Sequence, residues 1–436
     1  MIWDQEEVRS YLNQVCSKIR AREVHREIRQ ELASHIEELA EEKEAEGCAR
    51  EEAVRWAVRQ MGDPAEVGWN LHRIHRPRLH AGLLAGVLLL VLLGVISMYA
   101  VDAAVGYGVL LEHRIAGAAS GMGALLGLYF FDYRKLEDWP GGLYSLALVA
   151  MFACLWGYLD MAGRRVIPMS PFLLDWMIVS CLLILSAAGN LRAWRTRRRG
   201  VWLKSTCFYV LVPLLFFVKF HWFLGLLVYL SGYTLVCAMV TGRHTLAALQ
   251  TCGGLGLSAG LAMWVLDKRE QILHRLDVFM NPNAHNKDGS YQIMEMKEAI
   301  ESAGWWGHGV GNLGQKLPGL SQESVLAYLI HSFGWWSGAF LIAAVILLLS
   351  SMGSVPTRVS DPYGRAVSAG LTAMLAVQFG YSILMTFGWL PIIGISPPFF
   401  SADTSCMMIE MAVIGLVLGI YRRKDIIGKG GKHVVR

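Results

Sequence analysis

The sequence predicts an all-α protein: a polytopic membrane bundle of about ten transmembrane helices, preceded by a small soluble helical bundle. Of its 436 residues, 54% are hydrophobic and 17% are charged, against about 25% charged residues in a typical soluble domain. Residues 1–78 carry 29 charged side chains, whereas residues 79–436 carry only 46. Water is therefore the expected solvent of the first part and lipid that of the rest. This division argues against a secreted enzyme, a nucleic-acid-binding protein and a wholly cytosolic protein.

The expected spans follow from length and apolar content. A helix needs about 20 mostly apolar residues to cross the ~30 Å hydrocarbon core. Ten stretches qualify, although Lys219, His221 and Arg243 interrupt or bound those between 203 and 265. The expected spans are 80–101, 114–131, 142–159, 171–189, 203–219, 221–241, 246–265, 324–350, 364–388 and 403–421.

Residues 1–78 show a helical apolar pattern. Apolar residues recur at three- and four-residue steps from Val8 to Leu39, and a further helix is expected from about Ala49 to Met61. Gly47 and Gly62 separate these segments, and Asp63-Pro64 is typical of a helix start. The segment resembles the HAAS or permease-prefix domain of bacterial membrane proteins. We therefore expect a cytoplasmic interaction or regulatory domain.

The positions of Lys and Arg predict the orientation. Basic clusters lie at 73–78, 192–204 and 422–436, and with ten spans all three fall on one side of the membrane. Because such clusters favour the cytoplasm, both termini are expected there. The transmembrane domain would then cover 79–425, with an outward-facing loop at 266–323 and a basic cytoplasmic tail at 426–436. The eight cysteines lie in the first domain or in apolar spans and include no CxxC pair, so neither disulfides nor a cysteine metal site is expected.

The outer loop carries the most informative string, "GWWGHGVGNLGQ". Its glycines permit close backbone approach and positive φ angles. Trp305, Trp306, Trp335 and Trp336 suit a membrane interface. The polar residues of this region are Gln292, Lys297, Glu298, His308, Lys316 and Glu323.

Three motifs resemble those of the SEDS family (shape, elongation, division and sporulation; FtsW, RodA and SpoVE). The first covers the outer loop, the second is Asp132-Tyr133-Arg134 after the second span, and the third lies before the last span. The matching residues of the first are Pro282, Tyr291, Gln292, Ala299, Gly304, Gly307, Gly309, Pro318, Glu323 and Gly334. Those of the third are Pro391, Gly394, Pro398, Phe399, Ser401 and Ser405.

The resemblance implies polymerisation of lipid II into peptidoglycan glycan strands. It places the general base at Glu323, where the family has Asp, and implies substrate contacts at Arg165, Lys316, Gln292 and Lys297. It also implies a single-pass class B penicillin-binding protein as partner. The structural motif residues would be Gly304, Gly307, Gly309, Pro318, Pro391, Gly394, Pro398, Ser401 and Asp403. No cofactor, metal site or nucleic acid is expected; a divalent cation accompanying the pyrophosphate is left open.

Several departures from the family pattern leave two alternatives open. His331 and Ser332 stand where acidic residues are usual, Ala402-Asp403 replaces a Gly-Gly, and the family's Glu and Lys near Arg164-Arg165 are missing. Asp403 is open to two interpretations, helix capping or function. The chain could accordingly be a non-catalytic scaffold or regulator of a wall-synthesis complex, or a transporter of a lipid-linked precursor.

Overall fold

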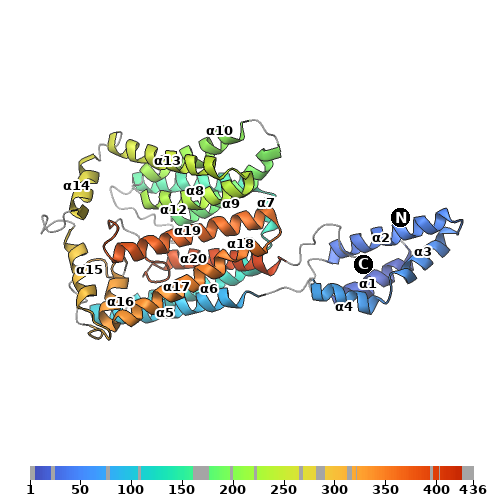
Figure 1. Cartoon of the computed structure of the whole chain (residues 1–436), viewed down its shortest axis with the longest axis horizontal. Coiled ribbons are helices and arrows are strands. Elements are labelled where there is room, and N and C mark those ends of the chain that lie inside the picture. The colour runs from blue at the N-terminus through green and yellow to red at the C-terminus, as the bar shows by residue number, and fades with distance from the viewer. Residues whose placement is uncertain are drawn as a thin grey trace. The chain divides into compact units, whose positions relative to one another are not determined.

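The computed structural model describes residues 5–20, 25–74, 79–106, 110–160, 176–196, 200–219, 223–264, 269–280, 290–311, 317–320, 322–392, 396–401 and 403–424. The regular elements within these ranges are all helices (Figure 1). The chain divides into two compact units. Unit 1 comprises Met1–Leu79, Val359–Asp361 and Tyr421–Arg436, and unit 2 comprises His80–Arg358 and Pro362–Ile420.

Unit 1 begins with four helices: α1 (Glu6–Lys18), α2 (His25–Ala45), α3 (Arg50–Gln60) and α4 (Pro64–Ile74). The predicted breaks at Gly47 and Gly62 are confirmed, since both have φ angles in the left-handed region, at +95° and +80°. Asp63 caps α4 as expected, because its carboxylate accepts a hydrogen bond from the Glu66 amide at 3.3 Å. The buried core contains Val8, Leu12, Val15, Ile28, Leu32, Ile36, Val54 and Ala57.

Unit 2 is the membrane bundle. Its long helices are α5 (Ala81–Val105), α6 (Leu110–Phe130), α8 (Pro140–Asp160), α9 (Trp176–Thr196), α12 (Phe223–Thr241), α13 (His244–Trp264), α17 (Trp335–Gly353), α19 (Pro362–Thr386) and α20 (Thr404–Arg422). The segment Val201–Lys219 is also helical, as α10 (Val201–Thr206), the π-helical turn η3 (Cys207–Leu211) and α11 (Val212–Lys219). Shorter elements are α7 (Arg134–Glu137), α14 (Arg269–Met280), α15 (Ser290–Ser302), α16 (Val325–Phe333) and α18 (Val355–Arg358).

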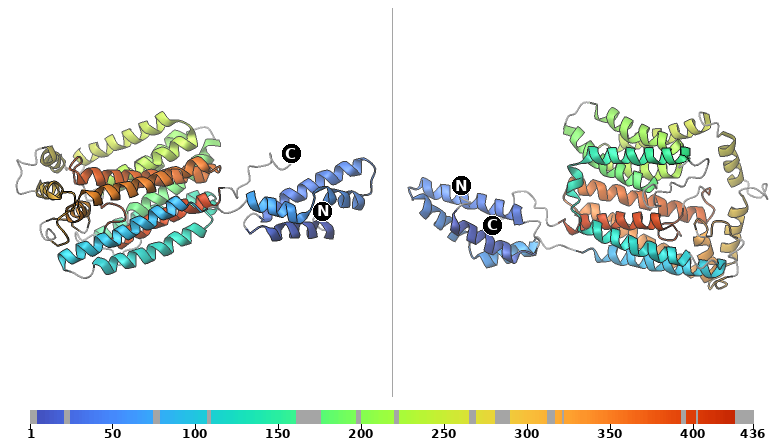
Figure 2. Two further views of the ribbon diagram at one scale, coloured as in Figure 1. Left: turned by 60° about the horizontal axis from the view of Figure 1, so that its bottom comes forward. Right: turned by 180° about the vertical axis from the view of Figure 1, so that it is seen from behind.

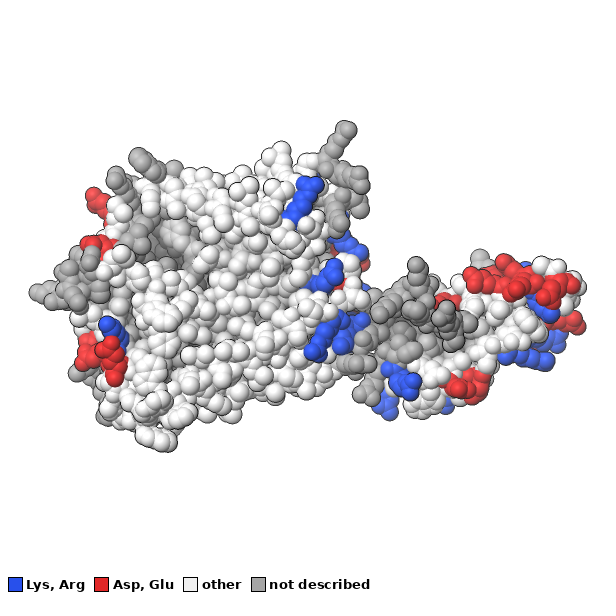
Figure 3. Space-filling view, viewed as in Figure 1, with Lys and Arg blue, Asp and Glu red and all other residues white. Residues whose placement is uncertain are grey.

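Each of the ten predicted spans contains helix, and within the described ranges six helical stretches are long and apolar enough to cross a membrane. The all-helical, multi-pass membrane fold is thereby confirmed, whereas the number of ten crossings stays a prediction. On the face of unit 2 that Figure 3 shows, the visible charged side chains lie at its two ends and leave a wide uncharged band between them. That distribution fits a protein that exposes its middle to lipid.

Small residues let the central helices pack closely. α12 lies against both α9 and α19. A Cβ atom at Gly232 of α12 would come within 2.4 Å of the Ile184 side chain on α9 and 2.7 Å of the Gly370 carbonyl oxygen on α19. Glycine is therefore required where the three helices meet, as is usual for helix contacts in membranes.

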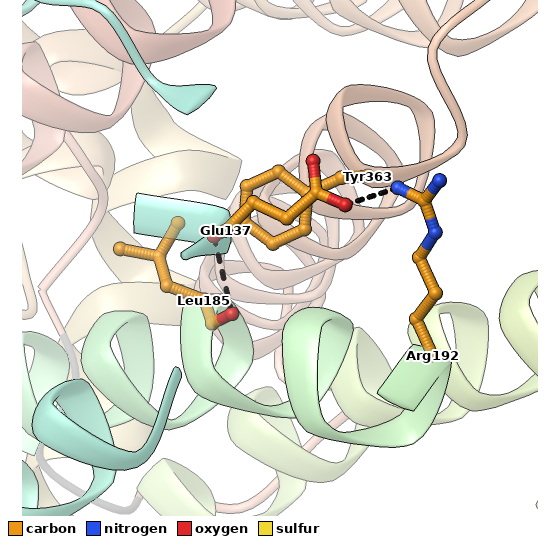
Figure 4. A network of polar contacts seen from close by, with 4 residues as sticks. All are labelled: Glu137, Leu185, Arg192 and Tyr363. Atoms are coloured by element: carbon orange, nitrogen blue, oxygen red, sulfur yellow. Dashed lines mark hydrogen bonds and ion pairs between the residues drawn. The ribbon is translucent and has the colours of Figure 1, made fainter. Parts of the chain in front are cut away.

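Polar contacts join α7, which follows α6, to α9, and join α9 to α19 (Figure 4). Glu137 of α7 forms an ion pair with Arg192 of α9, and the Tyr363 hydroxyl of α19 donates to the Leu185 carbonyl of α9 at 3.3 Å. Tyr133 of the Asp-Tyr-Arg motif is buried and stacks on Tyr363, with 6.4 Å between ring centroids. The motif after α6 thus supplies packing.

The predicted single span at 324–350 is wrong in detail. α16 ends at Phe333 and α17 begins at Trp335, and Gly334 between them adopts φ +83° and ψ 175°. The cause is the glycine-rich loop, because a Cβ at Gly334 would lie 2.1 Å from the Trp305 carbonyl oxygen. The segment expected as an outer loop also holds two helices, α14 and α15, which run across one end of the bundle (Figures 1 and 2).

Candidate functional site

The candidate site lies where α15 meets the turn that precedes α16. This turn closes through hydrogen bonds from the Gln322 and Ser324 amides to the Gly319 carbonyl, at 2.9 and 3.1 Å. Gly319 has φ +66°, a conformation that favours glycine. The Tyr328 amide then donates to the Ser324 carbonyl and starts α16. The turn therefore delivers Glu323 to the amino end of α16.

Gln292 on α15 holds the Glu323 carboxylate. Its Nε2 group lies 3.1 Å from Glu323 Oε2, 3.1 Å from Ser324 Oγ and 3.3 Å from the Pro318 carbonyl oxygen. The Ser324 hydroxyl donates to the same Pro318 carbonyl at 2.6 Å. Glu323 is half-buried. One oxygen of its carboxylate is thus fixed by the side-chain amide of Gln292.

Of the other predicted substrate contacts, Lys297 is the one that lies among the described residues, and it pairs elsewhere than with this carboxylate. Lys297 is 71% exposed and pairs with Glu301 one turn further along α15, at 3.7 Å. Arg165, Lys316 and Gly394 lie outside the described residues. The structure therefore brings Gln292, Pro318 and Glu323 together, and it places Lys297 on the outer face of α15.

The glycine-rich loop closes the other end of α16. Gly304, Gly307 and Gly309 have φ angles of +61°, +72° and +82°, which confirms the expected backbone freedom. The His308 and Gly309 amides donate to the His331 and Ser332 carbonyls, each at 3.0 Å. These bonds satisfy two of the carbonyl groups that a helix leaves unpaired at its carboxyl end.

Two histidines lie within this loop contact. The His331 side chain is buried, with Nδ1 3.1 Å from the Ala299 carbonyl oxygen, and the His308 ring lies 4.8 Å from it between centroids. The four tryptophans predicted at the membrane interface are exposed, and Trp305 and Trp336 touch, with ring centroids 5.5 Å apart. Their position at the interface stays a prediction.

The third motif forms a loop held by two buried charges. The Glu410 carboxylate of α20 accepts a hydrogen bond from the Phe399 amide at 2.8 Å, and Arg114 Nη1 of α6 donates to the Ser401 carbonyl at 3.0 Å. Phe399 has φ +65°, the only such non-glycine value in the described residues. Sequence reasoning missed both charges, although an ionisable residue inside an apolar span is a recognised functional signal.

The remaining residues of this motif have structural positions. The Pro391 carbonyl accepts a hydrogen bond from the Tyr381 hydroxyl at 2.8 Å, and Pro398 is buried. Asp403 precedes α20 and accepts a hydrogen bond from the Ser405 amide at 3.0 Å. Of its two interpretations, the structure supports helix capping. Among the described residues no cluster of three or more His, Cys, Asp or Glu side chains could hold a metal ion.

Apolar helices long enough to cross a membrane, the break between α16 and α17, and the Glu323 carboxylate at the amino end of α16 define a class of polytopic membrane protein. Residues 79–426 match the family described as cell cycle protein, FtsW/RodA/SpoVE. The chain belongs to this family, as the motifs predicted.

Relatives and solved structures agree with this assignment. The chain is 30% identical over 158 residues to a protein named probable peptidoglycan glycosyltransferase FtsW from Thioalkalivibrio, covering 35% of this chain and 40% of that one. It is 27% identical over 194 residues to the stage V sporulation protein E of Bacillus subtilis, covering 44% and 52%. The chain thus spans about half the length of these curated relatives.

The fold is shared with solved structures. The rod shape determining protein RodA of Thermus thermophilus superposes with a TM-score of 0.56 at 19% identity, covering 79% of this chain and 96% of that one. A structure titled as the coordination of polymerization and crosslinking by a peptidoglycan synthase complex gives 0.61 at 21% identity, covering 79% and 97%. At these identities the likeness concerns the fold.

Proposed function

We propose that this protein is a glycosyltransferase of the bacterial cytoplasmic membrane that polymerises lipid II into peptidoglycan strands, with Glu323 as general base. The names of its relatives and the membership of the family support the reaction class. The observation that carries the assignment of the base is the contact between Gln292 Nε2 and Glu323 Oε2 at 3.1 Å.

In this reaction the 4-hydroxyl oxygen of one sugar attacks the anomeric carbon of another. A new carbon–oxygen bond forms as the bond to the pyrophosphate breaks, and undecaprenyl pyrophosphate leaves with the electron pair. The hydroxyl proton passes to the carboxylate of Glu323. Such proton transfer contributes about 10²–10⁴-fold to a rate. The amide of Gln292 accepts no proton itself; it orients the carboxylate that does.

The family's Asp becomes Glu here, which adds one methylene to the base. A misplacement of about 1 Å can lower a rate by about 10²-fold. In this chain the longer side chain reaches across to α15, where Gln292 binds it. We propose that this second helix compensates for the added length by fixing the carboxylate.

The remaining parts of the assignment are proposals from the sequence. Arg165 and Lys316 would contact the pyrophosphate, with a divalent cation as an open addition. The partner would be a class B penicillin-binding protein, and both termini would be cytoplasmic. Lys297, paired with Glu301 on the exposed face of α15, would contact substrate only after that ion pair opens.

The test is polymerisation of purified lipid II by the full-length protein, with and without a class B penicillin-binding protein. Glu323→Gln should lower the rate by about 10²-fold or more, and Glu323→Asp should retain part of it. Glu298→Gln is the matched control, since Glu298 is an exposed carboxylate on α15. Full activity of Glu323→Gln would remove the proposed base.

One observation favours a second candidate, a non-catalytic scaffold of a wall-synthesis complex. No Lys or Arg among the described residues forms an ion pair with Glu323, and Lys297, a predicted substrate contact, is paired with Glu301. If the wild-type chain polymerises no lipid II with any candidate partner, this second function replaces the first.

A further inference from the structure

The four helices of unit 1 separate positive from negative charge along their length. The carboxyl end of α1, the amino end of α2 and the carboxyl end of α4 meet at one end of the bundle. Three contacts establish this: the Arg20 amide donates to His72 Nδ1 at 3.4 Å, His25 Nε2 lies 2.8 Å from the Ile19 carbonyl oxygen, and Gly68 packs against Lys18. The name basic end is used below for its exposed cations Lys18, Arg20, Arg26, Arg29 and Arg73.

A cluster of acidic side chains lies at the opposite end, while Glu6, Glu7, Glu31, Asp63 and Glu66 are exposed elsewhere on unit 1. The junction of α2 and α3 exposes Glu38, Glu41, Glu42, Glu46, Glu51 and Glu52, and Figure 3 shows them as a red cluster. The cations there are engaged, because Lys43 pairs with Glu46 and Arg50 pairs with Glu44. The helical bundle is therefore polarised, and its basic end attracts an anionic surface.

An exposed aromatic side chain lies beside these cations. Trp69 of α4 is 59% exposed and contacts His72 edge-on, with ring centroids 5.8 Å apart. Among the described residues of unit 1, the other large hydrophobic side chain so exposed is Leu79, at 53%. Exposed tryptophan with adjacent Lys and Arg is typical of segments that lie in the headgroup region of a membrane.

Chain length keeps this end within reach of lipid. α4 ends at Ile74 and the first membrane-spanning helix, α5, begins at Ala81. The few residues between them extend at most about 25 Å, and in sequence they add Arg76 and Arg78. The short linker thus keeps the basic end close to the surface of the bilayer that α5 enters.

We propose that the basic end of unit 1 docks on anionic phospholipid headgroups, with Trp69 entering the interface and the cations binding phosphate. The acidic junction of α2 and α3 then faces away from the bilayer. This inference is independent of any catalytic activity of unit 2.

The experiment measures amide hydrogen exchange of the full-length protein in two kinds of nanodisc. One is made of pure phosphatidylcholine, and the other contains about one third phosphatidylglycerol, which is anionic. The amides of residues 18–20, 25–29 and 69–74 should exchange at least about fivefold more slowly in the anionic nanodiscs. The difference should disappear in about 1 M NaCl, where charges are screened beyond ~3 Å. Amides of the buried residues Val15 and Ile36 should be unchanged, which reports that the bundle stays folded.

Matched variants distinguish a site from net charge. Lys18→Glu/Arg20→Glu/Arg73→Glu should abolish the lipid-dependent protection, and Trp69→Ser should weaken it. The variant Arg50→Glu/Arg55→Glu/Arg59→Glu changes the net charge by the same amount, but on α3, and should retain the lipid-dependent protection. Equal exchange in both lipids, protection that survives the first triple variant, or loss in both triple variants would each overturn the proposal.

Discussion

Removing the carboxylate of Glu410, which binds the loop of the third motif, is expected to destabilise unit 2 more than any single change within that motif. Arg114 and Glu410 are 1% and 2% exposed, and the carboxylate interacts electrostatically with the guanidinium. Arg114 Nε and Nη2 have no hydrogen-bond partner among the described residues. Removing one of two buried charges that attract each other leaves the other uncompensated, which costs about 3–5 kcal/mol where the two are directly paired.

The loss should be asymmetric between the partners. Arginine keeps its charge in proteins, whereas a buried carboxylate can take up a proton and become neutral. Glu410→Met therefore leaves a buried cation and also an unpaired Phe399 amide, which adds about 1–3 kcal/mol. Arg114→Met leaves a group that can neutralise itself, so its effect should be smaller. The double variant should recover part of the loss, because both charges are then gone.

The assay measures unfolding of the purified protein in mild detergent. The helical content is monitored as a denaturing detergent is added. Glu112→Gln is the control. Glu112 lies on α6, as Arg114 does, and its side chain is exposed, so the substitution should change stability by less than about 0.5 kcal/mol. A Glu410→Met effect below about 1 kcal/mol, or additive effects of the two substitutions, would refute the reasoning.

Three further outcomes follow from single contacts. Gly307→Ala should destabilise unit 2 and lower lipid II polymerisation, because its Cβ would lie 2.4 Å from the Ser332 carbonyl oxygen. Gly304→Ala has open space around its Cβ and should cost only about 1 kcal/mol. Thermal unfolding and the polymerisation assay compare the two variants. Asp403→Ala should lower stability by about 1 kcal/mol and Asp403→Asn by less, with polymerisation retained in both, as expected of a helix cap and not of a catalytic acid. Gln292→Leu should lower the polymerisation rate while Gln292→Glu lowers it further, because a second carboxylate would repel Glu323; steady-state rates on lipid II check the order.

The sequence was sufficient for the fold class because the membrane imposes long apolar helices and because charge marks the water-exposed unit. The glycines at 47, 62, 304, 307 and 309 were also predictable, since positive φ angles require them. The break at Gly334 was not predicted. It depends on the Trp305 carbonyl, a partner distant in sequence, and hydropathy alone runs continuously through the segment 324–350.

The candidate site was predicted only in part, because its contacts also join residues that are distant in sequence. Glu323 and Gln292 could be named from motifs, but their contact across α15 and the turn before α16 requires tertiary structure. Lys297 was named from proximity in sequence, and the helical period turns it to the exposed face of α15. Arg114 and Glu410 are 296 residues apart, so no local pattern could pair them.

Helix α5 contacts both α16 and the loop of the third motif. On α5, the Ala100 carbonyl accepts a hydrogen bond from Tyr328 of α16 at 3.0 Å. Six residues earlier, a Cβ at Gly94 would lie 2.1 Å from the Phe399 carbonyl and 2.2 Å from Arg114 Nη2. The first contact uses the backbone carbonyl of Ala100, and the second depends on the absence of a side chain at Gly94. Neither contact depends on the identity of a large side chain on α5. Gly94, rather than any residue touching Glu323, is therefore the position where a larger side chain should displace the third motif.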